Sequence, residues 1–154
     1  MFDLKNNIKL ETSLAPILKT ADVNGTGIDL KGFSSAALIV NAGAAGDTFS
    51  STVKTNFQIE HSDDDSTYTD VAQAGIVDGT IAAGGIFLKL DGTAGGNPDT
   101  AGGVFRVEYV GNSRYIRVVL AKTGTHSNGT PIGAIVVRSG ARHSGDNAFT
   151  AHNA

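Results

Sequence analysis

The acidic run Asp63-Asp64-Asp65 is one place in the chain where side chains could do chemistry. Three carboxylates could bind calcium, a hard cation that takes about six to eight oxygen ligands. The run lacks the alternating ligands and the closing glutamate of an EF-hand loop. Aspartate is also common in turns, because its side chain accepts hydrogen bonds from nearby backbone N–H groups. We therefore interpret the run as a turn rather than as a metal site.

Histidine could bind a metal or act as a general base, and the chain has His61, His126, His143 and His152. No two of them have the i, i+2 or i, i+4 spacing of a local site. The string HSGD, residues 143–146, contains the residue types of a hydrolase triad. A triad needs these groups on separate elements that converge in space, which neighbouring residues of one segment cannot do.

The glycine-rich segment at residues 91–103, DGTAGGNPDTAGG, resembles a phosphate-binding loop only in its glycine content. It has no lysine, and a phosphate loop lies between a strand and the N-terminus of a helix. We expect an exposed loop. With these motifs excluded, the sequence predicts no catalytic residue, no cofactor-binding residue and no metal ligand, so we expect a protein that is not an enzyme and needs no cofactor.

Three tyrosines, Tyr68, Tyr109 and Tyr115, offer a different chemistry, because aromatic rings stack on sugars. Tyr115 lies between Arg114 and Arg117 in the sequence and could be such a platform, although the chain has no tryptophan. An exposed tyrosine in a cross-strand pair also stabilises a sheet by about 0.2–1 kcal/mol. Sheet packing is the favoured interpretation, and sugar binding stays open as the alternative.

The elements that must position these side chains are strands. Residues 57–71, FQIEHSDDDSTYTDV, and residues 109–120, YVGNSRYIRVVL, alternate apolar and polar side chains with the period of two of a half-buried strand. Phe57 and Ile59 should share one face of the first strand, and Ile116 and Val118 should face the interior from the second. The residues around Asp64 then form the turn of a hairpin.

The same pattern recurs along the chain, with turn residues about every ten positions. We expect strands at residues 14–20, 28–30, 35–41, 55–62, 68–71, 85–91, 104–110, 114–120 and 132–138. Pro16 places the first at a sheet edge, and the apolar run at 35–41 suggests a strand covered on both faces. Asn24-Gly25 predicts a type I′ hairpin turn. The sequence therefore predicts an all-β fold, an antiparallel β-sandwich of jelly-roll type with about eight strands.

Composition restricts the domain organisation and the partners. The chain has 154 residues, 20 glycines, no cysteine and a formal net charge of −3. This length suits a single domain, and the charge is not that of a nucleic-acid-binding protein. No apolar stretch approaches the roughly 20 residues that span a membrane, and the N-terminus lacks a signal peptide's apolar segment, so we expect no membrane association. We predict an N-terminal arm (1–13), a sandwich domain (14–138) and a C-terminal tail (139–154).

Residues 15–44, APILKTADVNGTGIDLKGFSSAALIVNAGA, followed by the two strand signatures, give the chain a family resemblance. Over residues 15–138 it resembles the jelly-roll capsid decoration (cement) proteins of tailed bacteriophages. The resemblance implies a structural virion protein that binds across neighbouring major capsid subunits and stabilises the capsid. It also implies a location on the virion capsid surface after synthesis in the cytoplasm of the bacterial host, and a homo-oligomer, with a trimer favoured.

The sandwich pattern leaves some apolar residues near the two ends of the chain unexplained, namely Phe2, Leu4, Ile8, Leu10 and Phe149. We expect these residues to contact the capsid or a neighbouring subunit, and frayed ends are the other interpretation. The alternative function is a carbohydrate-binding jelly-roll module, used as a head spike or for adhesion to the host surface.

Overall fold

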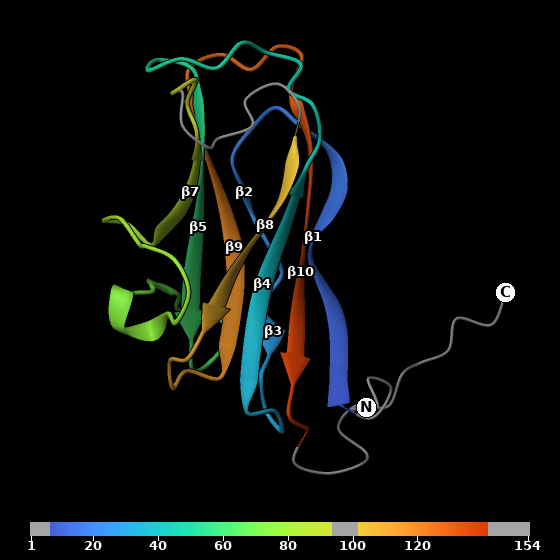
Figure 1. Ribbon diagram of the computed structural model, residues 1–154, viewed down its shortest axis with the longest axis vertical. Helices are drawn as coiled ribbons and strands as arrows, with labels where there is room; N and C mark the ends of the chain where they lie inside the picture. Colours follow the sequence, from blue (N-terminus) through green and yellow to red (C-terminus); the bar gives the residue numbers. More distant parts are fainter. Residues whose placement is uncertain (1–6, 94–101, 142–154) are drawn as a thin grey trace, which may run out of the picture.

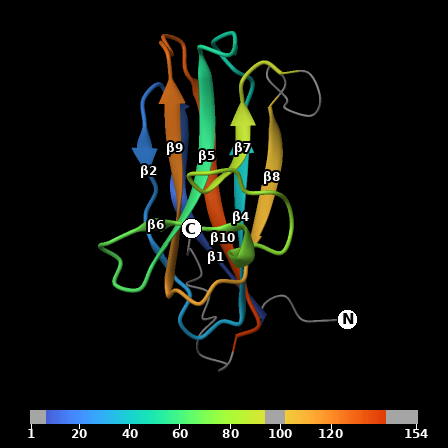
Figure 2. The same cartoon turned by 90° about the vertical axis from the view of Figure 1, so that its left-hand side faces the viewer.

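The computed structural model describes residues 7–93 and 102–141, which form two antiparallel sheets packed face to face (Figure 1). Sheet A has the order β1 (Ile8–Lys19), β10 (Thr130–Ser139), β4 (Ser35–Ala42) and β8 (Gly103–Tyr109). Sheet B has the order β2 (Val23–Asn24), β9 (Tyr115–Thr123), β5 (Lys54–Ser62) and β6 (Thr69–Asp70). In addition, β3 (Ile28–Asp29) pairs with β9, and β7 (Ile86–Leu90) pairs with β5 (Figure 2).

The strand pairing is nested from the ends of the chain inward. The first strand, β1, pairs with the last, β10; β2 and β3 pair with β9, β4 with β8, and β5 with β6 and β7. The pairs β10–β4 and β9–β5 complete the two sheets. This arrangement is a jelly roll, so the predicted fold class is confirmed. The described residues form ten strands rather than about eight, because each edge of sheet B consists of two short strands.

The core lies between the sheets and follows the period-two pattern that the sequence shows. Leu38 and Val40 point inward from β4, and both side chains are fully buried. They meet Phe57 and Ile59 of β5 and Val118 of β9, which are also fully buried. The only helical element among the described residues is a single 3₁₀ turn, Gln73–Gly75, so no described helix has the length or hydropathy needed to cross a membrane.

The N-terminal boundary differs from the expectation. β1 begins at Ile8, which pairs with Ser139, and Leu10 pairs with Val137. Residues 8–13 therefore belong to strand β1 of sheet A and not to a separate arm, because residues 8–12 pair continuously with β10. β1 is an edge strand, as Pro16 predicts. Residues 1–6 and 142–154 lie outside the described residues.

The prediction of a hairpin turn at Asn24-Gly25 is wrong. β2 and β3 both pair with β9 rather than with each other, and Gly25 is not among the described residues with positive φ. Gly25 is required for close approach instead. A Cβ atom there would lie 2.6 Å from Ser13 Oγ and 2.8 Å from the carbonyl oxygen of Val118.

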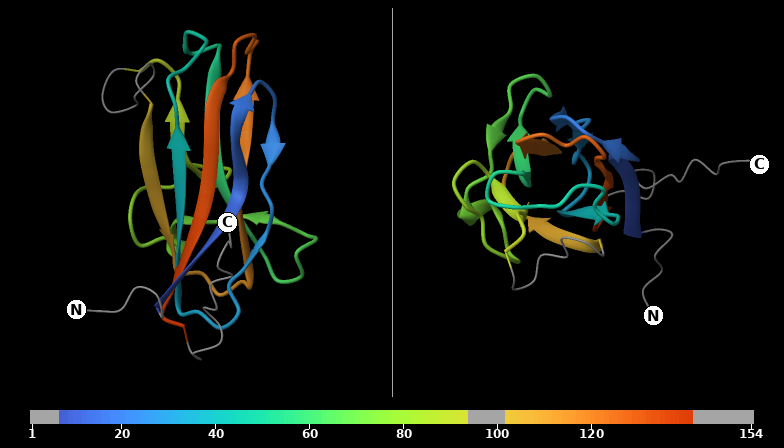
Figure 3. Two further views of the ribbon diagram at one scale, coloured as in Figure 1. Left: turned by 90° about the vertical axis from the view of Figure 1, so that its right-hand side faces the viewer. Right: turned by 90° about the horizontal axis from the view of Figure 1, so that it is seen from above.

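The sequence predicts that β4 is covered on both faces, but in the structure its outer face is only partly buried. Ile39 and Ala37 alternate with the buried Leu38 and Val40 and are only partly buried. Figure 3 shows sheet A from this side, and the described residues place no third layer over it. The apolar run predicted a covered face that the described part of the chain leaves open.

Candidate functional site

The edge strand β1 carries Ile8 and Leu10, the two predicted interface residues that lie within the described chain. Leu10 is 44% exposed and Ile8 is partly buried. Phe2, Leu4 and Phe149 lie outside the described residues. Sequence reasoning missed Ile17 and Leu18, which are 57% and 56% exposed although the pattern predicts a strand there. The neighbouring proline was the available signal, because proline marks strand edges.

Two irregularities bend β1 and expose this part of the strand. Its register with β10 shifts between Thr12 and Leu14 and again between Leu14 and Ile17. Such bulges twist an edge strand and disturb its pairing. The side chains of Ile17 and Leu18 follow the second shift and project from the edge of the sandwich.

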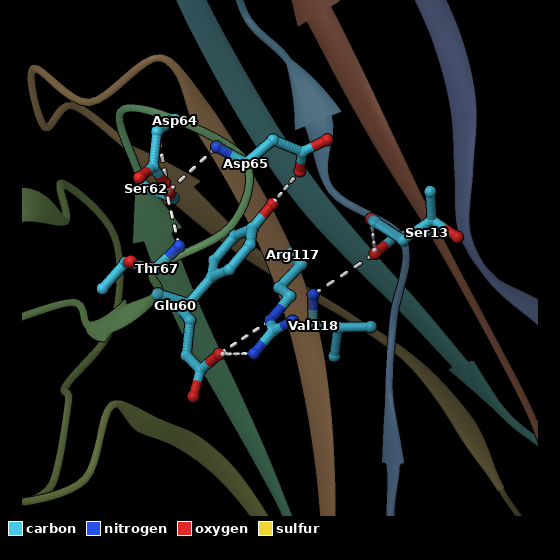
Figure 4. Close-up of polar contacts among 10 residues, drawn as sticks. Ser13, Glu60, Ser62, Asp64, Asp65, Thr67, Arg117 and Val118 are labelled. Atoms are coloured by element: carbon cyan, nitrogen blue, oxygen red, sulfur yellow. Dashed lines mark hydrogen bonds and ion pairs between the residues drawn. The ribbon is translucent and has the colours of Figure 1, made fainter.

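Ser13 lies at the first irregularity and joins the two sheets (Figure 4). It is 3% exposed; its hydroxyl donates to the carbonyl oxygen of Thr26 at 2.9 Å and accepts from the N–H of Val118 at 3.3 Å. The N–H of Thr26 donates to the carbonyl oxygen of Ser13 at 2.7 Å. These contacts fix β1 of sheet A to β9 and the β2–β3 linker of sheet B. The exposed end of β1 is therefore held by a rigid anchor.

The acidic run forms the turn that the sequence predicts. The Asp64 carboxylate accepts the N–H groups of Ser66 at 2.9 Å and Thr67 at 2.8 Å, and the Ser62 hydroxyl at 2.9 Å (Figure 4). These bonds, led by the one from Thr67, hold the pKa of Asp64 well below its usual range. Among the described residues, no group of three or more histidine, aspartate and glutamate side chains could hold a metal ion.

A stacked polar layer covers the outer face of sheet B beside this turn. Arg117 of β9 forms an ion pair with Glu60 of β5 at 2.7 Å, and its guanidinium lies 3.9 Å from the centre of the Tyr68 ring. The Tyr68 hydroxyl donates to Asp65. Burial, followed by this bond to a carboxylate, raises the pKa of Tyr68. The layer ties the β5–β6 turn to the sheet.

The tyrosines considered for sugar binding all have protein partners. Arg114 stacks 5.0 Å from the centre of the Tyr115 ring and forms two hydrogen bonds to Asp29, at 3.0 and 2.7 Å. Tyr109 is 3% exposed and its hydroxyl bonds to His61 Nδ1 at 2.9 Å. Tyr109 is therefore a core residue and not a platform, whereas the rings of Tyr68 and Tyr115 lie on the surface of sheet B.

A cleft of about 430 Å³ lies at the end of the sandwich between residues 30–36 and residues 109–114. Its charged groups include Arg114, which is already paired with Asp29. The lining also includes Lys31 and the buried Tyr109, together with serine, asparagine and backbone polar atoms. The described lining contains no histidine, aspartate or glutamate side chain that could act as a general base.

A second polar cluster lies where residues 124–129 approach residues 43–53. Lys122 Nζ donates to Thr55 Oγ1 at 3.0 Å, and burial lowers the Lys122 pKa. His126 is 5% exposed and its Nε2 lies 3.0 Å from the carbonyl oxygen of Thr123. Asp47 accepts the N–H groups of residues 128 and 129. The bonds to Asp47 join the two loops, whereas the bond from Lys122 joins β9 to β5.

Comparisons with family models, curated proteins and solved structures find no match to this chain. A proposal about its function therefore depends on the fold and on the exposed surfaces.

Proposed function

We propose that the protein is a structural, non-enzymatic component of a bacteriophage virion that binds across neighbouring major capsid subunits on the capsid surface. The observation that supports this most directly is the edge strand β1, where Ile17 and Leu18 are each more than half exposed on an anchored strand. Exposed apolar side chains on a sheet edge favour association with another chain. The jelly-roll scaffold fits the same role.

The mechanism is linkage between binding and stability. A protein that binds only the assembled shell stabilises it by mass action. Covering Ile17 and Leu18, each about half exposed, would contribute roughly 1 kcal/mol per side chain. Such small contributions become large on a capsid because several contacts act together.

The test is occupancy on purified expanded shells that lack the protein, measured by co-sedimentation. We expect the double variant Ile17→Asp/Leu18→Asp to reduce occupancy, while Gln58→Asp on the outer face of sheet B leaves it unchanged. Deleting residues 1–6 tests the predicted contribution of Phe2 and Leu4 without cutting into β1. Full occupancy by the double variant would contradict the β1 contact, and no binding by the wild type would contradict the function.

Carbohydrate binding is the second candidate, because Tyr68 and Tyr115 lie on one face of sheet B among carboxylate and guanidinium groups. Aromatic rings beside planar polar groups are the elements of a sugar site. A glycan array with the wild type and Tyr115→Ala tests it: loss of a specific signal in the variant supports the proposal, and an array without any signal contradicts it.

A further inference from the structure

The outer face of sheet A carries uncharged, mostly apolar residues on β1, β10 and β4, and charged residues of β8 border them. Cross-strand partners on this face form two adjacent rows. One row consists of Leu10, Val137, Ala37 and Glu108, and the next consists of Thr12, Ile135, Ile39 and Arg106. We refer to these eight residues as the sheet A face.

The sheet A face has an unusual composition for a sheet face that contacts solvent. In antiparallel sheets with one wet face, polar residues occupy that face. Here the three strands β1, β10 and β4 contribute no charged residue to either row, and the charges stand only on β8. Beyond the two rows, Val104 and Val110 are 69% and 51% exposed. An exposed apolar surface of this kind is typical of a sheet face that packs against another protein layer.

The two rows differ in height. A hollow of about 150 Å³ lies at the first row, and its lining includes Ala37, Val137, Glu108, Ser35 and Ser139. A space of this order accepts a benzene-sized apolar group. In the second row, the larger Ile39 and Ile135 occupy the positions of Ala37 and Val137. A ridge of isoleucine therefore lies beside a hollow.

We propose that the sheet A face binds a second copy of this chain, related by a two-fold axis that crosses the strands midway between the two rows. This axis places each row over the other row of the second copy. Ile39 then enters the hollow at Ala37 of the second copy, and the reverse contact forms by symmetry. Ile135 lies over Val137 of the second copy in the same way.

The charges on β8 are complementary under the same operation. Glu108 of one copy lies opposite Arg106 of the second copy, and each pair occurs twice. Within one copy Arg106 Nη1 lies 3.6 Å from Glu108 Oε1, and Arg106 Nη2 lies 2.9 Å from Asp78. Both side chains are well exposed, so the guanidinium and the carboxylate can also reach the second copy at the rim.

The available area meets the requirement of a dimer. Four strands at a spacing of about 4.8 Å and eight residues at about 3.4 Å each give roughly 500 Å² per copy, or about 1,000 Å² in total. This is near the lower limit of about 1,000 Å² for a specific interface. Two sheets that pack face to face lie about 10 Å apart, so the side chains of the two rows can interdigitate.

Sedimentation equilibrium of the full chain tests the proposal. We expect a dimer at about 100 µM, as befits a small interface. Ile39→Glu should weaken the dimer on the order of a hundredfold, because it places two carboxylates in hollows lined by Glu108. The matched control, Gln58→Glu on the outer face of sheet B, should leave the dimer intact. Circular dichroism checks that both variants are folded.

Charge reversal keeps the proposal falsifiable if Ile39→Glu does not fold. Arg106→Glu alone places two glutamates opposite each other and should weaken the dimer at least about tenfold. Arg106→Glu together with Glu108→Arg exchanges the charges and should restore it. A wild-type monomer or trimer, or a dimer that both Ile39→Glu and Arg106→Glu leave unchanged, would overturn the two-fold pairing. The isolated chain is sufficient for these measurements, so their failure is independent of capsid binding.

Discussion

Gly25→Ala should show how strongly the two sheets depend on their connection at Ser13. The new Cβ would lie 2.6 Å from Ser13 Oγ, 2.8 Å from the carbonyl oxygen of Val118 and 2.9 Å from that of Ser13. Two of these atoms belong to the backbone, so a change of side-chain rotamer cannot relieve the clash. The β2–β3 linker must move away from β1 or from β9.

The cost follows from this geometry. Overpacking a buried position costs about 1–3 kcal/mol. The hydrogen bond from the N–H of Gly25 to Val118, 2.8 Å long, would be weakened, for about 0.5–1.5 kcal/mol more. We expect a loss of about 2–4 kcal/mol in the free energy of unfolding, which lowers Tm by about 4–16 °C in a domain of this size. Urea titration with matched m-values is the direct measurement.

Gly43→Ala is the control, because Gly43 also lacks a positive φ and its nearest neighbours are side-chain atoms of Pro131, the closest at 3.2 Å. We expect this variant to change stability by less than about 1 kcal/mol. Adding Ser13→Ala to Gly25→Ala should not restore stability, since it removes the 2.6 Å contact but also both hydrogen bonds of the Ser13 hydroxyl, and the backbone contacts remain. A Gly25→Ala variant as stable as Gly43→Ala would refute the reasoning.

Three further predictions concern charged groups. Arg117→Met leaves Glu60, whose side chain is 17% exposed, without its partner and should cost about 1–3 kcal/mol, whereas Arg117→Met with Glu60→Leu should cost less; urea titration of both variants measures the difference. The lowered pKa of Asp64 means that its contribution is present above about pH 4 and is lost as the pH falls, so wild type and Asp64→Ala should converge in stability between pH 4 and pH 2; a constant difference would contradict this. Burial lowers the pKa of Lys122, so the unfolded chain binds more protons just below pH 10.5 and stability should rise with pH there. Lys122→Met should remove that rise when unfolding is followed from pH 7 to pH 10.5.

Most of the strands could be predicted from the local alternation of apolar and polar residues. Phe57 and Ile59 alternate with polar residues because one face of β5 is buried, and the same rule identifies Ile116 and Val118 in β9. The nested pairing could not be predicted in this way. Alternation shows which side of a strand faces the core but carries no information about its neighbour, such as β10 beside β1.

The candidate sites depend on contacts between distant parts of the sequence. Asp29 meets Arg114 across 85 positions, and the sequence around either residue shows no sign of the other. Nothing in the sequence distinguishes Ser13 from other polar strand residues, and only the structure shows that it joins the two sheets. The exposure of Ile17 was missed because an apolar residue in a strand is normally expected to be buried.

Pairing the first strand with the last has a consequence for synthesis on the ribosome. β1 leaves the exit tunnel before the other described strands, but its pairing partners in β10 extend to Ser139. The N-terminal strand must therefore wait for nearly the whole domain, with its apolar side chains unpaired throughout elongation. The Gly140 N–H, which donates to the carbonyl oxygen of Asn7 at 3.1 Å, closes this pairing. Nascent chains stalled before β10 emerges should thus remain exposed to chaperones, and release of that last strand should trigger completion of sheet A.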